Sequence, residues 1–149
     1  MPMVMSWPGH IKPGTQVTGL TQNIDFAPTF LDMCGIEIPE DMQGVSFRRL
    51  VEGENTPRNW RKSLYYHYYE FPGFHSVRAH YGVKMERYKL MHFYNDIDCW
   101  ELYDLQEDPM EMHNIYGQPG TEELVKELKT ELLRLQVQYD DPIRNIYKD

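Results

Sequence analysis

A loop between two aromatic stretches carries the residues of this sequence that are best suited to bind a polar or charged ligand. Within residues 70–80, a Pro-Gly turn is followed by His75, Arg78 and His80. An arginine guanidinium can donate paired hydrogen bonds to a sulfate or carboxylate, and a histidine can hydrogen-bond the hydroxyls of a sugar. We therefore treat these three as candidate substrate-binding residues, with His75 as the first choice. The alternative is that each is an ordinary side chain of an exposed loop or strand.

Other chemistry-bearing patterns are weaker. Asp96, Asp98, Glu101 and Asp104 supply carboxylate oxygens of the kind that bind calcium, but the segment lacks the glycine and distal glutamate of an EF-hand loop. A solvated turn is the favoured interpretation. No P-loop, dinucleotide fingerprint or Ser-His-Asp order is recognisable, and the two cysteines lack metal-type spacing. We therefore expect no catalytic residue and no metal site in this chain.

A cluster of tyrosines has two interpretations. It lies just before the loop and comprises Tyr65, Tyr66, Tyr68 and Tyr69. Aromatic faces can stack on sugars, which would suit a carbohydrate-binding module. Tyrosines at period two in a strand more commonly divide between core and surface packing.

Composition limits the classes of protein to consider. The chain has 149 residues, 41% hydrophobic and 13% aromatic, enough for one sizeable core or for one domain plus part of another. Its formal net charge of -8 argues against a nucleic-acid binder, because such binding depends on clustered lysine and arginine. No run of about eighteen apolar residues occurs, so we expect no membrane span.

The middle of the chain has the periodicity of half-buried strands. Aromatic and β-branched residues alternate with polar ones between turn-forming residues, which predicts four short strands at residues 63–69, 81–85, 88–94 and 99–105. Consecutive short strands favour an antiparallel meander with one buried face. The predicted fold class is therefore α+β, with an antiparallel sheet of about four strands packed by a C-terminal helix.

That helix is the strongest local prediction. Apolar side chains recur at helical spacing at Leu124, Leu128, Leu132, Leu135 and Tyr139. Thr121 is the expected N-cap, and burying four leucines at about 1.5–3 kcal/mol each would hold the helix on the sheet. A second, short helix is predicted after the last strand, with Asp108 as its cap and Pro109 as its first residue.

The first third of the chain reads differently. Residues 3–7 form an apolar run that ends at a Pro-Gly turn, which predicts a buried strand. Residues 24–34 have an apolar helical face and end at Gly35, and residues 46–51 predict a brief capped helix. Residues 54–58 are expected to be a linker.

Several of these motifs occur in an order known from one enzyme family. Residues 100–117, with the preceding residues 87–94, resemble the C-terminal subdomain of the type I sulfatases, which have an alkaline-phosphatase-like fold. Residues 1–14 look like that family's last core strand, and the Asp-x-x-Pro-Thr motif at residues 25–29 resembles its helix. The resemblance implies that residues 1–59 are the incomplete end of the catalytic α/β domain, and residues 60–149 the C-terminal subdomain.

The family's chemistry is expected elsewhere. Type I sulfatases hydrolyse sulfate esters with a formylglycine made within a Cys/Ser-x-Pro-x-Arg sequence, beside a calcium ion. Cys34 is followed by Gly-Ile-Glu, Cys99 by Trp-Glu-Leu, and Ser6 begins a run with His10 where arginine is required. The resemblance therefore implies that calcium and formylglycine belong to the full-length enzyme and that this chain holds no cofactor.

The resemblance narrows the expected function. Residues 81–84 and 88–96 look most like bacterial sulfatases acting on 6-sulfated glucosamine or N-acetylglucosamine of glycosaminoglycans. Within the full-length enzyme, the segment would then close the substrate cleft, supply specificity and bind a sulfated carbohydrate. No nucleic-acid or membrane partner is expected. Exposed apolar surface at residues 3–5 and 24–34 would favour self-association. The sequence encodes no location, although the family implies a periplasmic or extracellular one. The alternative is a non-catalytic carbohydrate-binding or structural module with a tyrosine-rich sheet.

Overall fold

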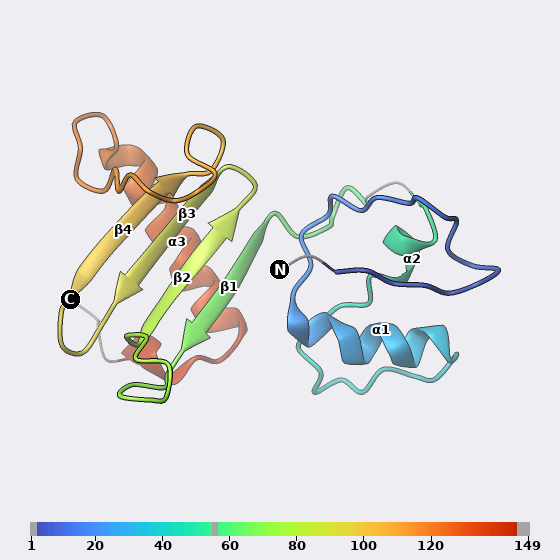
Figure 1. The fold of residues 1–149 in the computed structure, drawn as a ribbon. Helices are drawn as coiled ribbons and strands as arrows, with labels where there is room; N and C mark the ends of the chain where they lie inside the picture. Colours follow the sequence, from blue (N-terminus) through green and yellow to red (C-terminus); the bar gives the residue numbers. More distant parts are fainter. Residues whose placement is uncertain (1–2, 55–56, 146–149) are drawn as a thin grey trace. The chain divides into compact units, whose positions relative to one another are not determined.

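The computed structural model describes residues 3–54 and 57–145, and the chain divides into two compact units, Met1–Arg61 and Lys62–Asp149. The helices of unit 1 are η1 (Asn23–Asp25), α1 (Phe26–Met33) and α2 (Arg48–Val51). Unit 2 contains β1 (Ser63–Tyr68), β2 (His80–Met85), β3 (Tyr88–Phe93), β4 (Cys99–Asp104), α3 (Glu122–Gln138) and η2 (Pro142–Asn145). Figure 1 shows these elements along the chain.

Unit 2 is an antiparallel meander with the strand order β1-β2-β3-β4. The register places Val83 opposite Leu90, and Leu90 opposite Leu102, so one face of the sheet carries a row of aliphatic side chains. Helix α3 lies across that face (Figure 1). The four predicted strands and the C-terminal helix are confirmed.

The core of unit 2 is apolar and closed. Val83, Leu90 and Leu102 are fully buried, and Leu128 and Leu132 of α3 pack into the same cluster. Helix α3 begins after Thr121 as predicted, although the Thr121 hydroxyl donates to the carbonyl of Gln118 at 2.8 Å and does not cap the helix. Tertiary packing of the leucine face therefore holds this helix.

Unit 1 is organised around one carboxylate. Asp25 is completely buried and accepts from the backbone N–H groups of Gln22 at 2.8 Å and Val45 at 2.9 Å. The Arg61 guanidinium donates to both of its oxygens, at 2.7 and 2.8 Å. The Asp25 carboxylate thus joins three segments that are far apart in the sequence.

The rest of the Asp-x-x-Pro-Thr motif supports the same junction. Thr29 donates to the carbonyl of Asp25 at 2.6 Å and accepts from the backbone N–H of Phe47 at 3.0 Å. A Cβ at Gly44 would lie 2.6 Å from the carbonyl carbon of Ile24, so only glycine allows this close approach of the backbones. The motif therefore acts as a structural junction of unit 1.

Two element predictions are wrong. Met3, Met5 and Trp7 lie in an extended segment that forms no strand, because none of the described residues of unit 1 belongs to a strand that could pair with it. No helix follows Pro109 either. Glu111 has a φ of 55°, a left-handed conformation that a helix cannot contain, and the Asp108 carboxylate accepts from the backbone of His113 at 2.7 Å. The helix at residues 24–34 and the brief helix before residue 51 are confirmed.

Candidate functional site

Residues 69–79 connect β1 to β2 and carry His75 near the tip of the connection. The backbone N–H of Ser76 donates to the carbonyl of Gly73 at 3.2 Å, which closes a turn around Phe74 and His75. The two rings meet edge to face, with centroids 5.4 Å apart. Phe74 is 93% exposed and His75 is also exposed. The tip of the loop therefore presents an aromatic ring and an imidazole to solvent as a pair.

Arg78 lies at the end of this loop and is held from two sides. Its Nη1 forms an ion pair with Asp96 in the β3–β4 turn. Its guanidinium also lies over the ring of Phe71, 5.6 Å from the centroid, and Phe71 packs against the core of unit 2. Arg78 is thus an oriented side chain that remains 43% exposed.

His80 is the first residue of β2 and lies on the sheet. Its Nδ1–H donates to the carbonyl oxygen of Arg78 at 2.8 Å, since a carbonyl can only accept. Its ring stacks on Tyr68 with centroids 5.6 Å apart and also contacts Phe93 at 5.2 Å. The structure therefore joins His80 to Arg78 at the base of the loop, whereas the ring contact of His75 is with Phe74 at the tip.

The tyrosine cluster is mostly packing. Tyr65 packs into the core of unit 2, and Tyr66 crosses Gly82, where an added Cβ would lie 2.7 Å from the ring. The hydroxyl oxygens of Tyr66 and Tyr68 are buried without a hydrogen-bond partner among the described residues. Tyr69 is 63% exposed. A sugar-stacking surface made of all four rings is therefore not formed, and nothing here favours the free-standing carbohydrate-binding module.

Two histidines of unit 2 have nearly inaccessible side chains that form structural hydrogen bonds. The first, His67, lies 2.6 Å from the carboxylate of Asp141 and 2.7 Å from the hydroxyl of Tyr94. Burial raises the pKa of Asp141, but hydrogen bonds from Tyr65 and His67 outweigh this effect and hold the pKa below its usual value. This network ties β1 to the segment after α3.

The second, His92, is 3% exposed on β3. Its Nε2–H donates to Asp98 at 2.7 Å, and its Nδ1 accepts from the hydroxyl of Tyr81 at 2.8 Å. The ring stacks on Trp100 with centroids 4.2 Å apart. Burial lowers the pKa of His92, against the opposing effect of Asp98, so the ring is neutral at pH 7.

The residues of this chain do not fit the calcium and formylglycine of the sulfatases. Asp104 is hydrogen-bonded to Arg87 at 2.7 Å, Glu101 to Tyr103 at 2.8 Å, and Asp98 to His92. Among residues 3–54 and 57–145, no group of three or more histidine, cysteine or acidic side chains could hold a metal ion. Neither cysteine lies in a Cys/Ser-x-Pro-x-Arg sequence. We therefore derive no step through calcium or formylglycine from these residues.

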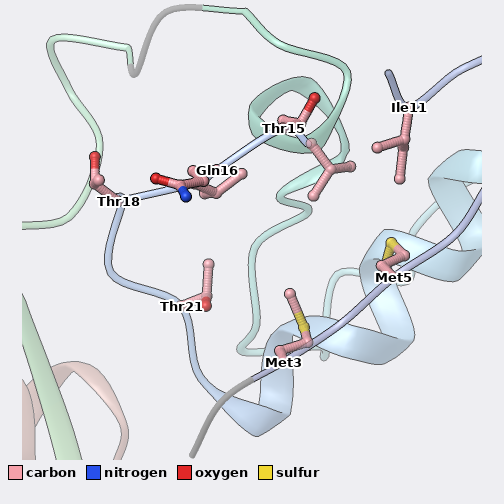
Figure 2. Close-up of a pocket in the computed structure, with 9 residues that line it drawn as sticks. Met3, Met5, Ile11, Thr15, Gln16, Thr18 and Thr21 are labelled. Carbon is pink, nitrogen blue, oxygen red and sulfur yellow. The ribbon is translucent and has the colours of Figure 1, made fainter. Parts of the chain in front are cut away.

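Unit 1 contains a pocket of about 520 Å³. Figure 2 shows Met3 and Met5 along one segment, and Thr15, Gln16 and Thr18 along another. The lining consists of apolar side chains, threonine hydroxyls and the amide of Gln16, and it includes no acidic or basic side chain. This pocket therefore offers no charged side chain to a sulfate.

Comparison with known proteins identifies the family. The family model for the C-terminal region of N-sulphoglucosamine sulphohydrolase matches residues 1–138. The chain belongs to this sulfatase family. The fold and the family that the sequence motifs indicated are thereby confirmed.

The sulfatase segment resembles both bacterial and animal relatives in sequence. It is 49% identical over 142 residues to an N-acetylglucosamine-6-O-sulfatase of Bacteroides thetaiotaomicron, covering 95% of this chain and 25% of that protein. It is 30% identical over 161 residues to arylsulfatase A of Homo sapiens, covering 91% of this chain and 30% of that protein. The chain thus spans 25% to 30% of the length of these relatives.

Solved structures give the same assignment. A protein in complex with its substrate D-glucosamine-2-N,6-O-disulfate superposes with a TM-score of 0.88 at 48% identity, covering 96% of this chain and 29% of that chain. A phosphonate monoester hydrolase of Silicibacter pomeroyi superposes with a TM-score of 0.72 at 28% identity, covering 91% of this chain and 29% of that one. The sulfatase segment therefore has the C-terminal architecture of the alkaline-phosphatase-like enzymes.

Two residues next to the predicted site residues were not predicted: Phe74 at the tip of the loop, and Asp96, which lies in the β3–β4 turn and pairs with Arg78. Phe74 had a local signal, since an aromatic residue directly after Pro-Gly in a polar loop is poorly placed for a core. Asp96 was interpreted only as part of a solvated turn, and its pairing with Arg78 depends on strand register.

None of the helices that the structure describes has the length and hydropathy of a membrane span.

Proposed function

We propose that this chain is the C-terminal part of a sulfatase that hydrolyses sulfate esters of glycosaminoglycan sugars such as 6-sulfated N-acetylglucosamine. The observation that carries the proposal is the 49% identity, over 95% of the chain, to an N-acetylglucosamine-6-O-sulfatase. The similarity to a protein bound to D-glucosamine-2-N,6-O-disulfate supports the same substrate class. In this proposal, residues 1–59 end the catalytic α/β domain and residues 60–149 form the C-terminal subdomain.

The role of the segment is to close the substrate cleft and supply specificity. The exposed imidazole of His75 can hydrogen-bond a sugar hydroxyl or a sulfate oxygen. The Arg78 guanidinium has five N–H donors, so Nη1 can hold Asp96 while other N–H groups face an anion. His80 adds a third polar group through its Nε2, because its Nδ1 is already engaged by the carbonyl of Arg78. The nucleophile and the calcium ion belong to the part of the enzyme outside this chain.

Substitution of His75 in the full-length enzyme tests the specificity role. His75→Ala should lower kcat/KM for 6-sulfated N-acetylglucosamine by roughly tenfold, the effect of losing one hydrogen bond of about 1.4 kcal/mol. A small aryl sulfate should be hydrolysed at nearly the wild-type rate, because it has no sugar hydroxyls to contact the loop.

The matched control is His113→Ala, which removes another exposed imidazole of unit 2, one that is 82% exposed. This variant should leave both substrates unaffected. Equal losses on the sugar and on the aryl sulfate in His75→Ala would contradict the specificity role.

The family chemistry has its own test. Mass spectrometry of the native protein should find a longer chain with an upstream Cys/Ser-x-Pro-x-Arg sequence, and the 149-residue chain alone should not turn over an aryl sulfate. Robust, calcium-dependent turnover by the homogeneous 149-residue chain would show that a nucleophile is present in it.

We also propose that the 149-residue chain self-associates through apolar surface of unit 1. Val4 is 97% exposed, and Phe30 and Ile36 are 53% and 55% exposed. Sedimentation velocity should show the average mass rising with concentration, and Phe30→Ser should reduce that rise. A monomer at all concentrations would disprove the proposal.

A further inference from the structure

The register of the sheet brings two connections together at one end of unit 2. His80 pairs with Phe93, and the backbone N–H of Tyr94 donates to the carbonyl of Ala79 at 3.2 Å, one residue beyond the ladder. The end of the β1–β2 loop and the start of the β3–β4 turn are therefore neighbours. Arg78 and Asp96 lie on these two connections and form an ion pair.

The Arg78 side chain also closes its own loop. Its guanidinium lies 5.6 Å from the ring centroid of Phe71, so the two ends of residues 71–78 are in contact. Phe71 is anchored by packing against the core of unit 2. Asp96 holds the guanidinium from the opposite connection, and the loop that presents Phe74 and His75 is thus fastened at its base.

The solvent exposure of Arg78 and Asp96 limits the strength of their ion pair. Arg78 and Asp96 are 43% and 40% exposed, and ion pairs this open to water shift an equilibrium by about fivefold at most. Such a pair is too weak to decide whether unit 2 folds. A fivefold shift is enough to change how often a surface loop holds its binding conformation.

We propose that Asp96 is a positioning residue for substrate recognition, acting through Arg78 to hold the loop that carries His75. This inference rests on the proposed function, since it assigns the loop to the sugar of a sulfated substrate. Asp96 does not contact the substrate. It keeps the guanidinium over Phe71 and so raises the fraction of molecules whose loop is ready to bind.

The test uses Asp96→Asn in the full-length enzyme. KM for 6-sulfated N-acetylglucosamine should rise roughly three- to fivefold with kcat unchanged, and kinetics on an aryl sulfate should not change. Asp96→Glu keeps the charge and should restore most of the affinity. Glu107→Gln removes one negative charge from the exposed turn after β4 and should have no effect. Raising the salt concentration should raise the KM of the wild-type enzyme toward the KM of Asp96→Asn, because salt screens the ion pair.

A second readout separates the two levels of the proposal. In the same protein, NMR signals of the His75 ring and amide exchange of residues 69–79 should change in Asp96→Asn and stay unchanged in Glu107→Gln. Unchanged loop signals, or changed signals with an unchanged KM, would overturn the positioning role. A wild-type enzyme that is inactive on the sulfated sugar would overturn the proposed function, whereas the loop signals would still report whether Asp96 holds the loop.

Discussion

The two units of this sulfatase segment are stabilised in different ways. Among the described residues, unit 2 has ten buried apolar side chains in one cluster between sheet and helix. The corresponding cluster of unit 1 has three buried members in the same described part of the chain, Phe47, Leu50 and Val51. Unit 1 depends in addition on the completely buried carboxylate of Asp25, with its four hydrogen bonds to Gln22, Val45 and Arg61.

This difference explains two kinds of sequence motif. The leucines of α3 can be exchanged for other apolar residues of similar volume, because burial of apolar surface is not directional. The Asp-x-x-Pro-Thr motif cannot vary in this way, since each hydrogen bond of Asp25 and Thr29 needs a particular atom at a particular distance. A motif that forms structural hydrogen bonds can therefore be as specific in residue type as an active-site signature.

The largest expected effect comes from breaking the junction of unit 1. Asp25→Ala would remove the buried carboxylate that accepts two hydrogen bonds from the Arg61 guanidinium, which is 13% exposed, and should lower the free energy of unfolding of unit 1 by about 3–5 kcal/mol. In a urea titration followed by NMR, the indole signals of Trp7 and Trp60 report unfolding of unit 1, and their transition midpoint should move to a lower urea concentration. The midpoint reported by Trp100 in unit 2 should not change.

The control for this prediction is Asp32→Asn. Asp32 lies on α1 and pairs with Arg48, but it is 35% exposed, so its loss should cost less than about 1 kcal/mol. Equal urea midpoints of unit 1 in Asp25→Ala and Asp32→Asn would mean that the buried carboxylate is not what stabilises unit 1.

The opposite perturbation removes core volume from unit 2. Leu102→Ala, at a fully buried position of β4, should lower the free energy of unfolding by about 2–5 kcal/mol because it leaves a cavity under α3. In the same urea titration, the midpoint reported by Trp100 should now fall, while the midpoints reported by Trp7 and Trp60 should not. Leu133→Ala is the control, since Leu133 is 53% exposed on the same helix, and a similar loss there would argue against a packed core.

The smallest expected effect is a pH dependence confined to unit 2. The folded-state pKa of His92 lies below the ordinary value of 6.5, because burial disfavours the charged ring. Between the folded-state pKa and the unfolded-state pKa of His92, the unfolded chain therefore binds more protons than the folded chain. The contribution of His92 to the free energy of unfolding is complete above pH 6.5 and is lost as the pH falls through the folded-state pKa.

Urea titrations of wild type and His92→Gln between pH 5 and 7.5 test this sign. The stability difference between the two proteins should shrink as the pH is lowered. A difference that grows toward low pH would mean that His92 is charged in the folded protein.

The sequence was sufficient for the elements that carry their own periodicity. The strands around Val83 and Leu90, the leucine face of α3 and the helix ending near Gly35 were all visible as alternation or helical spacing. The predicted strand at Met3 was wrong because an apolar run does not say whether a neighbouring strand exists to pair with it. The predicted helix after Pro109 was wrong because Glu111 takes a left-handed conformation.

The candidate site shows the same division. The polar residues of the loop are local in sequence, so His75, Arg78 and His80 could be proposed from residue type and a Pro-Gly turn alone. One partner of Arg78 is not local, because Asp96 reaches Arg78 only through the pairing of β2 with β3. The pairing of Arg78 with Asp96 could therefore not be predicted before the register was known.

The meander of unit 2 also has a consequence for how the molecule folds. Every strand pairs with its neighbour in sequence, and β2 and β3 are joined by only Glu86 and Arg87, so the sheet can grow by closing short loops. The junction of unit 1 requires Arg61 to find Asp25 across 36 residues. Because the entropy lost on loop closure rises with loop length, contacts of this kind form late. We therefore expect the sheet of unit 2 to form before the ion pair between Arg61 and Asp25, although the His67–Asp141 contact of unit 2 spans 74 residues and should also form late.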